Sequence, residues 1–584
     1  MAVFFLLVFN LALINYFFQK RGSISLAFLF TGILFGIATI IVTEISSFFH
    51  AYNTSSSIYF WSILCSLLAF VSIKKKLFDI SKYKLLYITN KKIIWFIGSI
   101  SILLFIQGIL YPPNNWDSMT YHMARIAHWV MNESIEPYPT HIYRQIYQPP
   151  LAEWMIGQIC LLNKADYFAN SLQLFFLLGS LGVVNLLMLL CKIEKKTRNI
   201  ACALVITTPS IFMQATATQN DIVVVFFILC ILYFLILFFK FKNSTSALFL
   251  GLSIGCALLT KGTAFVYLIP IMGVGVLLLI RSIYQKQFVF LKDASLLLLI
   301  VAISLTIPFS HYYRNYKLSN DIFGASEDSY FNENITTKST LIGIVKNIGI
   351  HMSTPITSNI TNQIVEKAHL VTNIPISDKK YSYNGIQFKM NNWNHNEDEV
   401  SNFFQVILFG FVLLYWIVNR KKQIPTLNYT ILFCLFTFFI FTFILKWQPW
   451  HMRLQVPLFM FMAIPTAIAI NTINKEKISY AILGILSVYC LVLAIYNPNR
   501  PLLKNEKQEK LTTRFEKYFV AMPPYLVEYK QWRYCVTKNI PTEWGVHGDT
   551  WEYPIYYDCF EKNRKPFSVI NIKNQSKKSI SLNQ

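Results

Sequence analysis

Charged residues are scarce in this chain, and acidic residues are the scarcest. Of its 584 residues, 14% are charged and only 29 are Asp or Glu, whereas 54% are hydrophobic and 16% are aromatic. Apolar stretches about as long as a bilayer-spanning helix, roughly 20 residues, recur along the sequence. The composition therefore argues against a water-soluble domain and predicts a polytopic α-helical membrane protein.

Several common patterns are also missing. The sequence has no glycine-rich phosphate-binding loop, no fixed-period repeat and no compact cluster of His and carboxylate residues. The first absence argues against a nucleotide-binding fold, and the last leaves a divalent metal undecided. The first apolar run lacks a basic segment before it and is followed by Lys20 and Arg21, so we expect a retained span and not a cleaved signal peptide.

The ten cysteines do not predict a disulfide framework. Most of them lie inside apolar runs, where small buried side chains are the ordinary interpretation. Cys535 and Cys559 lie in the polar C-terminal tail and could pair if that tail is exported. Their spacing alone does not establish the bond.

The basic residues indicate how the chain crosses the membrane. The formal net charge is +23, but Lys and Arg gather in short loops between apolar runs. Such loops mark the cytoplasmic side of a membrane, so we do not expect a nucleic-acid partner. The basic loops are residues 74–92, 192–198, 281–292 and 420–422. The intervening segment 111–166 is balanced to acidic and is therefore predicted to face outward.

This alternation predicts about fourteen spans, with both termini outside. The spans are expected near residues 2–18, 24–48, 57–72, 94–110, 167–191, 199–213, 221–239, 247–259, 263–280, 294–310, 402–418, 428–446, 455–471 and 478–496. Three outward segments are too large to be connectors: residues 111–166, 311–400 and 497–584. In the tail, a helix over 504–520 followed by turns predicts a small mixed α/β domain.

Asp117 is the first candidate for chemistry, because it directly follows the apolar run that ends at Leu110. Asp117, Tyr121 and Arg125 have i, i+4, i+8 spacing, which places them on one face if residues 118–131 form an amphipathic helix on the membrane surface. Burial would raise the pKa of Asp117 toward a useful range. It could then accept a proton while Arg125 orients it. A structural ion pair explains the same pattern.

Other polar residues of the predicted outer face could bind substrate. Lys261 lies between two short apolar runs, where it could neutralise a phosphate, although snorkelling of a lysine at the end of a span explains it too. His451 and Arg453 could bind a lipid phosphate, or merely attract anionic lipid. The remaining substrate-binding candidates are Arg144, Gln148, Asn220 and Asp221.

Four motifs together resemble a known family. They are the outer loop with Asp117, the turn YQPPLAEW, the hairpin GLSIGCALLTKGTAFVYLIP and the stretch KWQPWHMRLQVPL. In order, sidedness and spacing they are similar to the C-type glycosyltransferases, in the branch of the protein O-mannosyltransferases and the bacterial aminoarabinose transferases that act on lipid A. The resemblance covers roughly residues 94–470. Gln148 departs from it, since relatives often carry a charged residue just before the paired prolines.

The resemblance implies a fold, a reaction and a donor. It implies a polyprenyl-phosphate sugar donor, inverting transfer to an envelope lipid, glycan or protein on the exported side of the plasma membrane, and Asp117 as the base. Lys261, Arg453 and His451 would bind the donor phosphate, and some relatives carry a divalent metal. The expected regions are accessory spans at 1–93, a seven-span catalytic module at 94–310, a large outer loop at 311–400, further spans at 401–496 and a soluble domain at 497–584.

Two other functions fit parts of the sequence. A flippase or transporter of lipid-linked oligosaccharides would use the outer charges as gates, but it is expected to carry ionisable residues near the bilayer midplane and related half-repeats. An envelope scaffold would depend on its soluble tail more than on Asp117. The sugar and the acceptor are not named by any motif.

Overall fold

Long apolar sequences form the helices of a bundle, because backbone polar groups in a bilayer must bond within their own segment. The computed structural model describes residues 2–77, 79–324, 330–390, 396–419, 424–472, 476–538, 544–546, 548–556, 560 and 572–574. The long helices are α1 (Phe4–Arg21), α2 (Ile24–Phe48), α3 (Thr54–Lys74), α4 (Ile80–Leu110), α8 (Leu172–Leu190), α11 (Asp221–Phe241), α12 (Ser244–Thr260), α13 (Thr263–Tyr284), α14 (Phe290–Thr306), α18 (Phe403–Val418), α19 (Pro425–Ile444), α21 (Val456–Thr472) and α22 (Glu476–Ile495).

Shorter elements fill the connections. They are the π-helical turn η1 (Ser118–His122), α5 (Met123–Met131), α6 (Arg144–Tyr147), α7 (Leu151–Asn163), η2 (Ala169–Ser171), α9 (Lys195–Ile206), α10 (Pro209–Gln214), α15 (Phe309–Ser319), α16 (Thr337–Met352), α17 (Ser358–Thr372), η3 (Tyr383–Gly385), α20 (His451–Leu454), α23 (Glu506–Glu509), α24 (Arg514–Lys517), α25 (Tyr525–Thr537), η5 (Tyr553–Ile555) and the parallel strands β1 (Trp544–Val546) and β2 (Ile572–Asn574).

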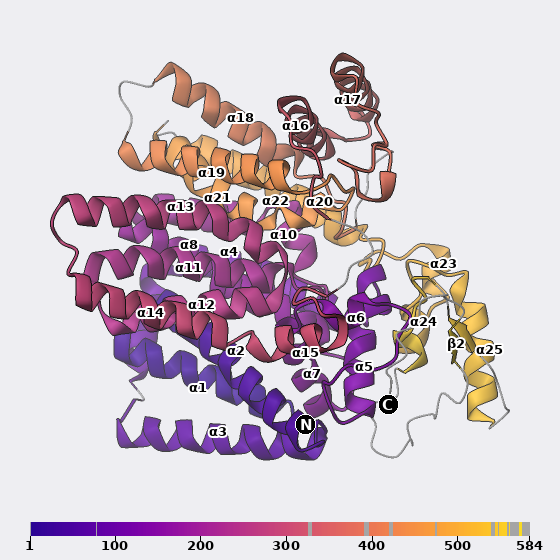
Figure 1. Ribbon diagram of the computed structural model, residues 1–584. Helices are drawn as coiled ribbons and strands as arrows, with labels where there is room; N and C mark the ends of the chain where they lie inside the picture. Colours follow the sequence, from indigo (N-terminus) through magenta and orange to yellow (C-terminus); the bar gives the residue numbers. More distant parts are fainter. Residues whose placement is uncertain are drawn as a thin grey trace.

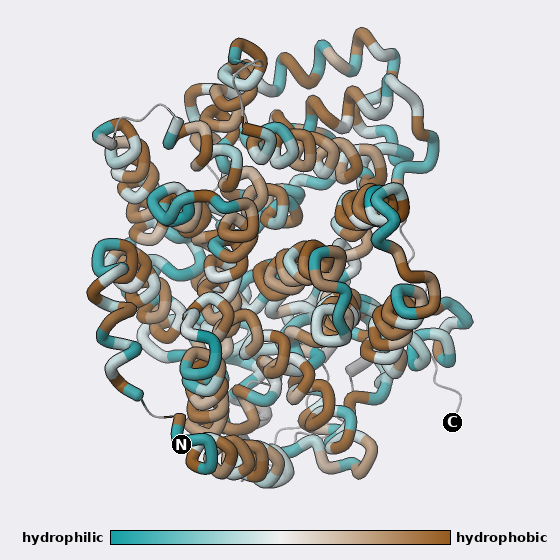
Figure 2. The backbone as a smooth tube through the Cα atoms, turned by 90° about the vertical axis from the view of Figure 1, so that its left-hand side faces the viewer, coloured by the Kyte–Doolittle hydropathy of each residue, from teal (hydrophilic) through white to brown (hydrophobic). Residues whose placement is uncertain are grey.

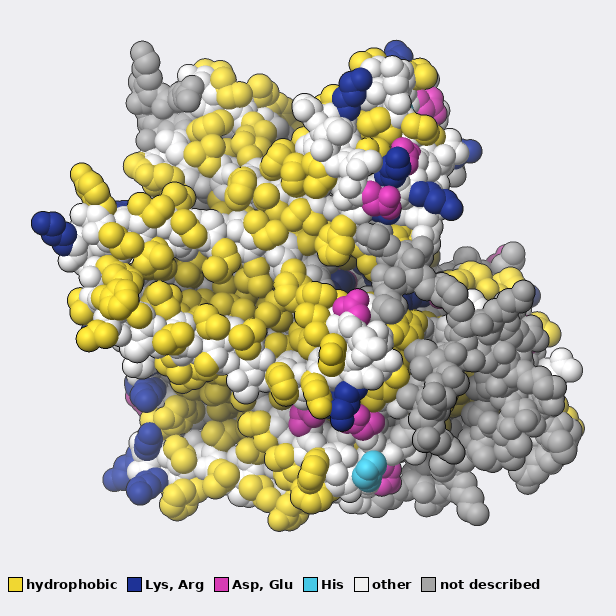
Figure 3. All heavy atoms as spheres, in the orientation of Figure 1, with side chains coloured by type: hydrophobic (Ala, Val, Ile, Leu, Met, Phe, Trp, Pro, Cys, Tyr) yellow, Lys and Arg dark blue, Asp and Glu magenta, His cyan; other side chains and the backbone are white. Residues whose placement is uncertain are grey.

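The long helices lie side by side, and the polar segments gather at one end of the bundle (Figure 1). That end carries η1, α5, α6, α15 and α20, whereas the basic loop over residues 281–292, between α13 and α14, lies at the opposite end. Viewed from the basic end, most of the long helices are seen nearly end-on (Figure 2). Hydrophobic side chains cover the flank between the two ends (Figure 3), as expected for a surface that faces lipid.

Among the described residues, fewer than the predicted fourteen helices qualify as spans by length and composition. Among the described residues, eight helices are long and apolar enough to cross a membrane, or nine if the bent pair α14 and α15 forms one span. Three further apolar helices, α12, α18 and α21, are shorter. Fourteen spans are therefore not confirmed. The run predicted at 199–213 breaks into α9 and α10, because Pro209 begins a new helix.

The three N-terminal helices are part of the same packed bundle. α2 packs against α8, and Phe226 of α11 fills the space left by Gly32 of α2 and Gly179 of α8. A Cβ atom at Gly32 would lie 2.5 Å from Phe226 Cζ, and one at Gly179 would lie 2.8 Å from Phe226 Cε2. From α3, Trp61 donates a hydrogen bond to Gln158 of α7 at 3.0 Å.

The tail does not form the helix predicted over 504–520. That stretch contains the one-turn helices α23 and α24, each begun by a side-chain capping box. An independent α/β domain is not confirmed either, since β1 and β2 pair over three residues each. Buried tail aromatics such as Tyr518, Phe519 and Trp551 instead continue the hydrophobic core of the bundle.

Candidate active site

Three charged side chains from distant segments meet at the polar end of the bundle. Arg453 Nη2 contacts Asp117 Oδ2, and Arg453 Nη1 binds Asp398 Oδ1 at 2.8 Å. The side chains of Asp117, Arg453 and Asp398 are 12%, 10% and 22% exposed. One guanidinium thus bridges two carboxylates that are mostly buried and keep a small exposed fraction.

Local structure explains how each of these side chains reaches the site. Asp117 precedes η1, and Asn115 accepts a hydrogen bond from the Ser118 N–H at 2.7 Å, which shapes the turn. Arg453 lies in the one-turn helix α20, which follows α19. Asp398 lies just before α18 and accepts a hydrogen bond from Gln219 Nε2 at 2.7 Å.

A second ion pair lies beside the first. Lys261 ends α12, and its Nζ binds Asp221 Oδ1, at the first residue of α11, at 2.6 Å. Asp221 Oδ2 is buried and has no partner among the described residues. Asn220 donates to the Thr260 carbonyl at 3.2 Å, which joins the ends of α11 and α12. Burial lowers the pKa of Lys261 against the opposing charge of Asp221, and the charge of Arg453 adds to the lowering.

The electrostatics of the two carboxylates differ. Burial would raise the pKa of Asp117, but Arg453, Arg144 and His122 hold it well below its usual range. The expectation of a raised pKa is therefore wrong, because cations outweigh the loss of water. Burial raises the pKa of Asp398 to about 7, with Asp117 and Glu397 adding to the effect against Arg453.

The predicted amphipathic surface helix over 118–131 is also wrong. Most of η1 and α5 is buried, and the π-helical turn interrupts the even spacing. Tyr121 still donates to Asp117 Oδ2 at 3.4 Å. Arg125, however, turns to Glu153 and to the backbone carbonyl of Gln148, at 2.8 Å. Arg125 therefore does not orient Asp117, and Gln148 contributes its carbonyl to the Arg125 site.

Of two further predicted site residues, Arg144 lies near Asp117 and His451 does not. Arg144 lies over the Tyr121 ring, 5.3 Å from its centroid, and lowers the pKa of Asp117 through its charge. It also binds Asp549 of the tail at 2.6 Å. His451, in contrast, bonds to Asn347 at 2.8 Å and is buried away from the two carboxylates. We find no contact that would bring His451 to a phosphate held by Arg453 within the described residues.

Asp398 is the site residue that the sequence reasoning missed. It belongs to an acidic run, Glu397 to Glu399, that directly precedes an apolar helix. Asp117 has the reverse placement in the sequence, because it follows an apolar run where Asp398 precedes one. Carboxylates at the outer end of an apolar run were therefore the available signal. Among the residues that the structure describes, no group of three or more His, Cys, Asp and Glu could hold a metal ion.

Two structures of ArnT from Cupriavidus metallidurans are similar to this chain, one titled as bound to undecaprenyl phosphate and one in the apo state. They share 13% and 12% identity and give TM-scores of 0.44 and 0.41. Each comparison covers 81% of this chain and 75% of the other. No curated protein matches the chain.

A family comparison is more specific. Residues 147–308 match the sequence model of the family described as dolichyl-phosphate-mannose-protein mannosyltransferase. The matched segment includes Asp221 and Lys261 but neither Asp117 nor Arg453. The match agrees with the resemblance seen in the sequence motifs. Over residues 147–308, the chain is therefore similar to the dolichyl-phosphate-mannose-protein mannosyltransferases.

Proposed function

We propose that this protein transfers a sugar from a polyprenyl-phosphate donor to an envelope lipid, glycan or protein at the outer face of the plasma membrane. The observation that carries the proposal is the bridge from Arg453 to Asp117 and Asp398, with the Lys261–Asp221 pair beside it. This arrangement offers a base and two cations in one partly exposed place. The ArnT structure titled as bound to undecaprenyl phosphate supports the choice of donor.

The proposed reaction is a single displacement at the anomeric carbon of the donor sugar. The acceptor hydroxyl attacks that carbon, the bond from carbon to the phosphate oxygen breaks, and Asp117 takes the hydroxyl proton. The lipid phosphate leaves with the bonding electron pair. A direct displacement inverts the configuration of the sugar carbon. Tyr121, which donates to Asp117, would help to hold the carboxylate in place.

Arg453 couples donor binding to the strength of the base. In the structure, Arg453 holds the pKa of Asp117 low, which makes that carboxylate a poor proton acceptor. A donor phosphate would compete with Asp117 for the guanidinium, and Lys261 would share the phosphate charge. Loss of the close cation raises the pKa of Asp117. The base would thus become stronger only when the donor is bound.

Mass spectrometry of lipid-linked sugars and envelope glycans tests the proposal. Cells would carry the wild-type protein, Asp117→Asn, the exposed control Glu133→Gln from the same outer loop, or no copy. We expect a polyprenyl-phosphate sugar to accumulate in the null and Asp117→Asn cells, while one glycan loses that sugar. Glu133→Gln should resemble the wild type. The sugar that moves would identify the donor and the acceptor together.

Other outcomes would distinguish the competing functions. Normal transfer by Asp117→Asn would exclude that residue as the base. A lipid-linked sugar that accumulates only on the cytoplasmic side of null cells would favour a transporter. Unchanged sugar profiles in all four strains would contradict the glycosyltransferase proposal altogether.

A further inference from the structure

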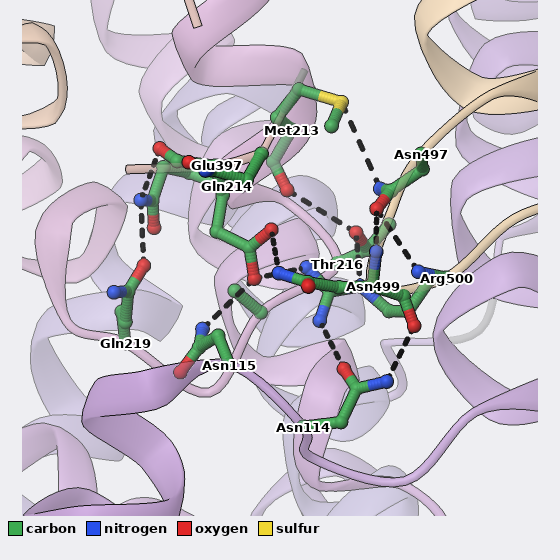
Figure 4. Close-up of polar contacts among 12 residues, drawn as sticks. Asn114, Asn115, Met213, Gln214, Thr216, Gln219, Glu397, Asn497, Asn499 and Arg500 are labelled. Carbon is green, nitrogen blue, oxygen red and sulfur yellow. Dashed lines mark hydrogen bonds and ion pairs between the residues drawn. The ribbon is translucent and has the colours of Figure 1, made fainter. Parts of the chain in front are cut away.

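A fully buried ion pair lies next to the candidate site. Arg500 Nη2 binds Glu397 Oε1 at 2.5 Å, and both side chains are 0% exposed (Figure 4). The same guanidinium donates to Asn114 Oδ1 at 3.0 Å and to Thr216 Oγ1 at 3.1 Å. Arg500 begins the tail just after α22, so one side chain joins the tail to three other segments.

Glu397, like Arg500, forms hydrogen bonds with several other segments. Its carboxylate accepts hydrogen bonds from Asn115 Nδ2 at 2.9 Å and from Asn499 Nδ2 at 2.8 Å. Its backbone carbonyl accepts from Gln214 Nε2 at 3.1 Å. Figure 4 shows Asn115 and Asn499 approaching the Glu397 carboxylate from different sides. The position of Glu397 is therefore defined by side chains from three other segments.

Both carboxylates of the site are adjacent to this network in the chain. Asp398 directly follows Glu397. On the other side, Asn115 binds Glu397 through its Nδ2 and the Ser118 N–H through its Oδ1, and so holds both ends of the turn that carries Asp117. A shift of Glu397 would therefore move Asp117 and Asp398 relative to Arg453.

Stability is a weak explanation for such a pair. Removing two charges from water costs free energy that their mutual attraction often only offsets, and well-packed apolar residues can replace a buried ion pair without loss. Directional bonds from one carboxylate to several segments do, however, define a geometry that apolar contacts would leave looser.

We propose that Glu397 and Arg500 are positioning residues, which set the spacing of Asp117 and Asp398 across Arg453. The pair makes no contact with the donor and acts through Asp398 and through the Asn115 turn. This inference rests on the proposed function. It also makes the start of the tail, residues 497–500, a structural part of the site.

The chain offers a matched control. Asp166 is buried in the first outer loop and binds Arg514 of the tail at 2.7 Å, together with Tyr518 and Tyr553 at 2.5 and 3.0 Å. Like Glu397, it joins the tail to the bundle. Unlike Glu397, it has no bond to a neighbour of Asp117 or Asp398 within the described part of the chain.

A double-mutant cycle on the full-length protein separates positioning from a purely structural role. Glu397→Gln, Asp398→Asn and the double variant would be measured for binding of undecaprenyl phosphate and, once the sugar is known, for the rate of transfer. We expect Glu397→Gln to lower both by at least ~10-fold and to have a smaller effect in the Asp398→Asn background, because only the route through the Asn115 turn remains there. Asp166→Asn should have little effect in either background.

The outcomes can be read separately. Equal effects of Glu397→Gln in both backgrounds would overturn the positioning of Asp398 by this pair. If Glu397→Gln does not yield a folded protein, Arg500→Lys, which keeps the charge but loses the planar fork, replaces it in the same cycle with the same criterion. If wild-type protein neither binds undecaprenyl phosphate nor transfers a sugar, the proposed function itself fails. Wild-type binding together with control-like behaviour of Glu397→Gln would refute the positioning role alone.

Discussion

Arg453 is the side chain that defines the candidate site. A lysine could contact one carboxylate, but only the fork of a guanidinium holds Asp117 and Asp398 at once, as observed here. The bridge has two consequences: it suppresses the basicity of Asp117, and it keeps a cation where a phosphate would arrive. Each consequence can be tested by changing one residue.

Arg453→Lys tests the fork. We expect binding of undecaprenyl phosphate to weaken by at least ~10-fold, about 1.4 kcal/mol, because a compact ammonium group cannot replace both bonds. Isothermal titration in detergent would measure the affinity. Arg314→Lys is the control. Arg314 forms a similar ion pair with Glu44, 2.8 Å long, and this pair is not part of the candidate site. Equal affinity of Arg453→Lys and wild type would contradict a donor role.

The pKa of Asp398 predicts a pH dependence of donor binding. Burial raises that pKa to about 7, so below this pH the side chain is mostly neutral and above it mostly anionic. A neutral Asp398 repels a phosphate less and releases Arg453. We therefore expect tighter binding of undecaprenyl phosphate at about pH 6 than at about pH 8.

Asp398→Asn serves as the reference for that measurement. The lipid phosphate titrates in the same pH range in both proteins, so the difference between them isolates Asp398. The variant should lose the Asp398 component of the pH dependence. An identical pH dependence of the two affinities would show that Asp398 does not titrate against the donor.

At the scale of elements, helices were predicted more reliably than spans. Each predicted apolar run contains helix, because apolar composition and helical backbone bonding are local properties. Broken and short helices were not foreseen: α9 and α10 replace one span, and η1 replaces the start of a regular helix. Packing of helices by small residues, as at Gly32, joins the N-terminal spans to the rest.

Gly32→Val tests that packing. Phe226 lies against both Gly32 and Gly179, so its ring cannot move from one without approaching the other. We expect a loss of stability of about 1–3 kcal/mol from overpacking, seen as a lower temperature of unfolding in detergent. Gly410→Val is the control, because a Cβ there meets no atom within 4 Å. Equal unfolding temperatures would show that α2 can shift freely.

At the scale of the whole molecule, the tail is attached to the outer loop that carries Asp117. Glu552 binds His141 at 3.0 Å, His128 at 3.2 Å and Gln145 at 2.9 Å, and Asp549 binds Arg144. Burial alone would raise the pKa of Glu552, but the two histidines lower it to about 2. Glu552 therefore contributes to the stability of the folded protein at pH values above its ordinary pKa of 4.5. This contribution is lost only as the pH falls toward about 2.

Glu552→Gln should loosen the tail at neutral pH, because the two histidines lose their carboxylate partner. Limited proteolysis would show faster cleavage between α22 and the tail, by about 3- to 10-fold if roughly 1 kcal/mol is lost. The exposed Glu528→Gln on α25 is the control. Unchanged cleavage would indicate that the aromatic core contacts alone hold the tail.

The sequence by itself determined the helical membrane class and the helical segments, and it indicated Asp117, Arg453, Lys261 and Asp221 as candidates, since span composition, loop charge and polar residues at span ends are all visible locally. Which charges meet was decided by the tertiary structure. Asp117 and Arg453 are 336 positions apart, and nothing local distinguishes Arg453 from Arg125 as the partner of Asp117. Asp398 and the Glu397–Arg500 pair likewise acquire their roles only when packing brings the outer loops and the tail to one end of the bundle.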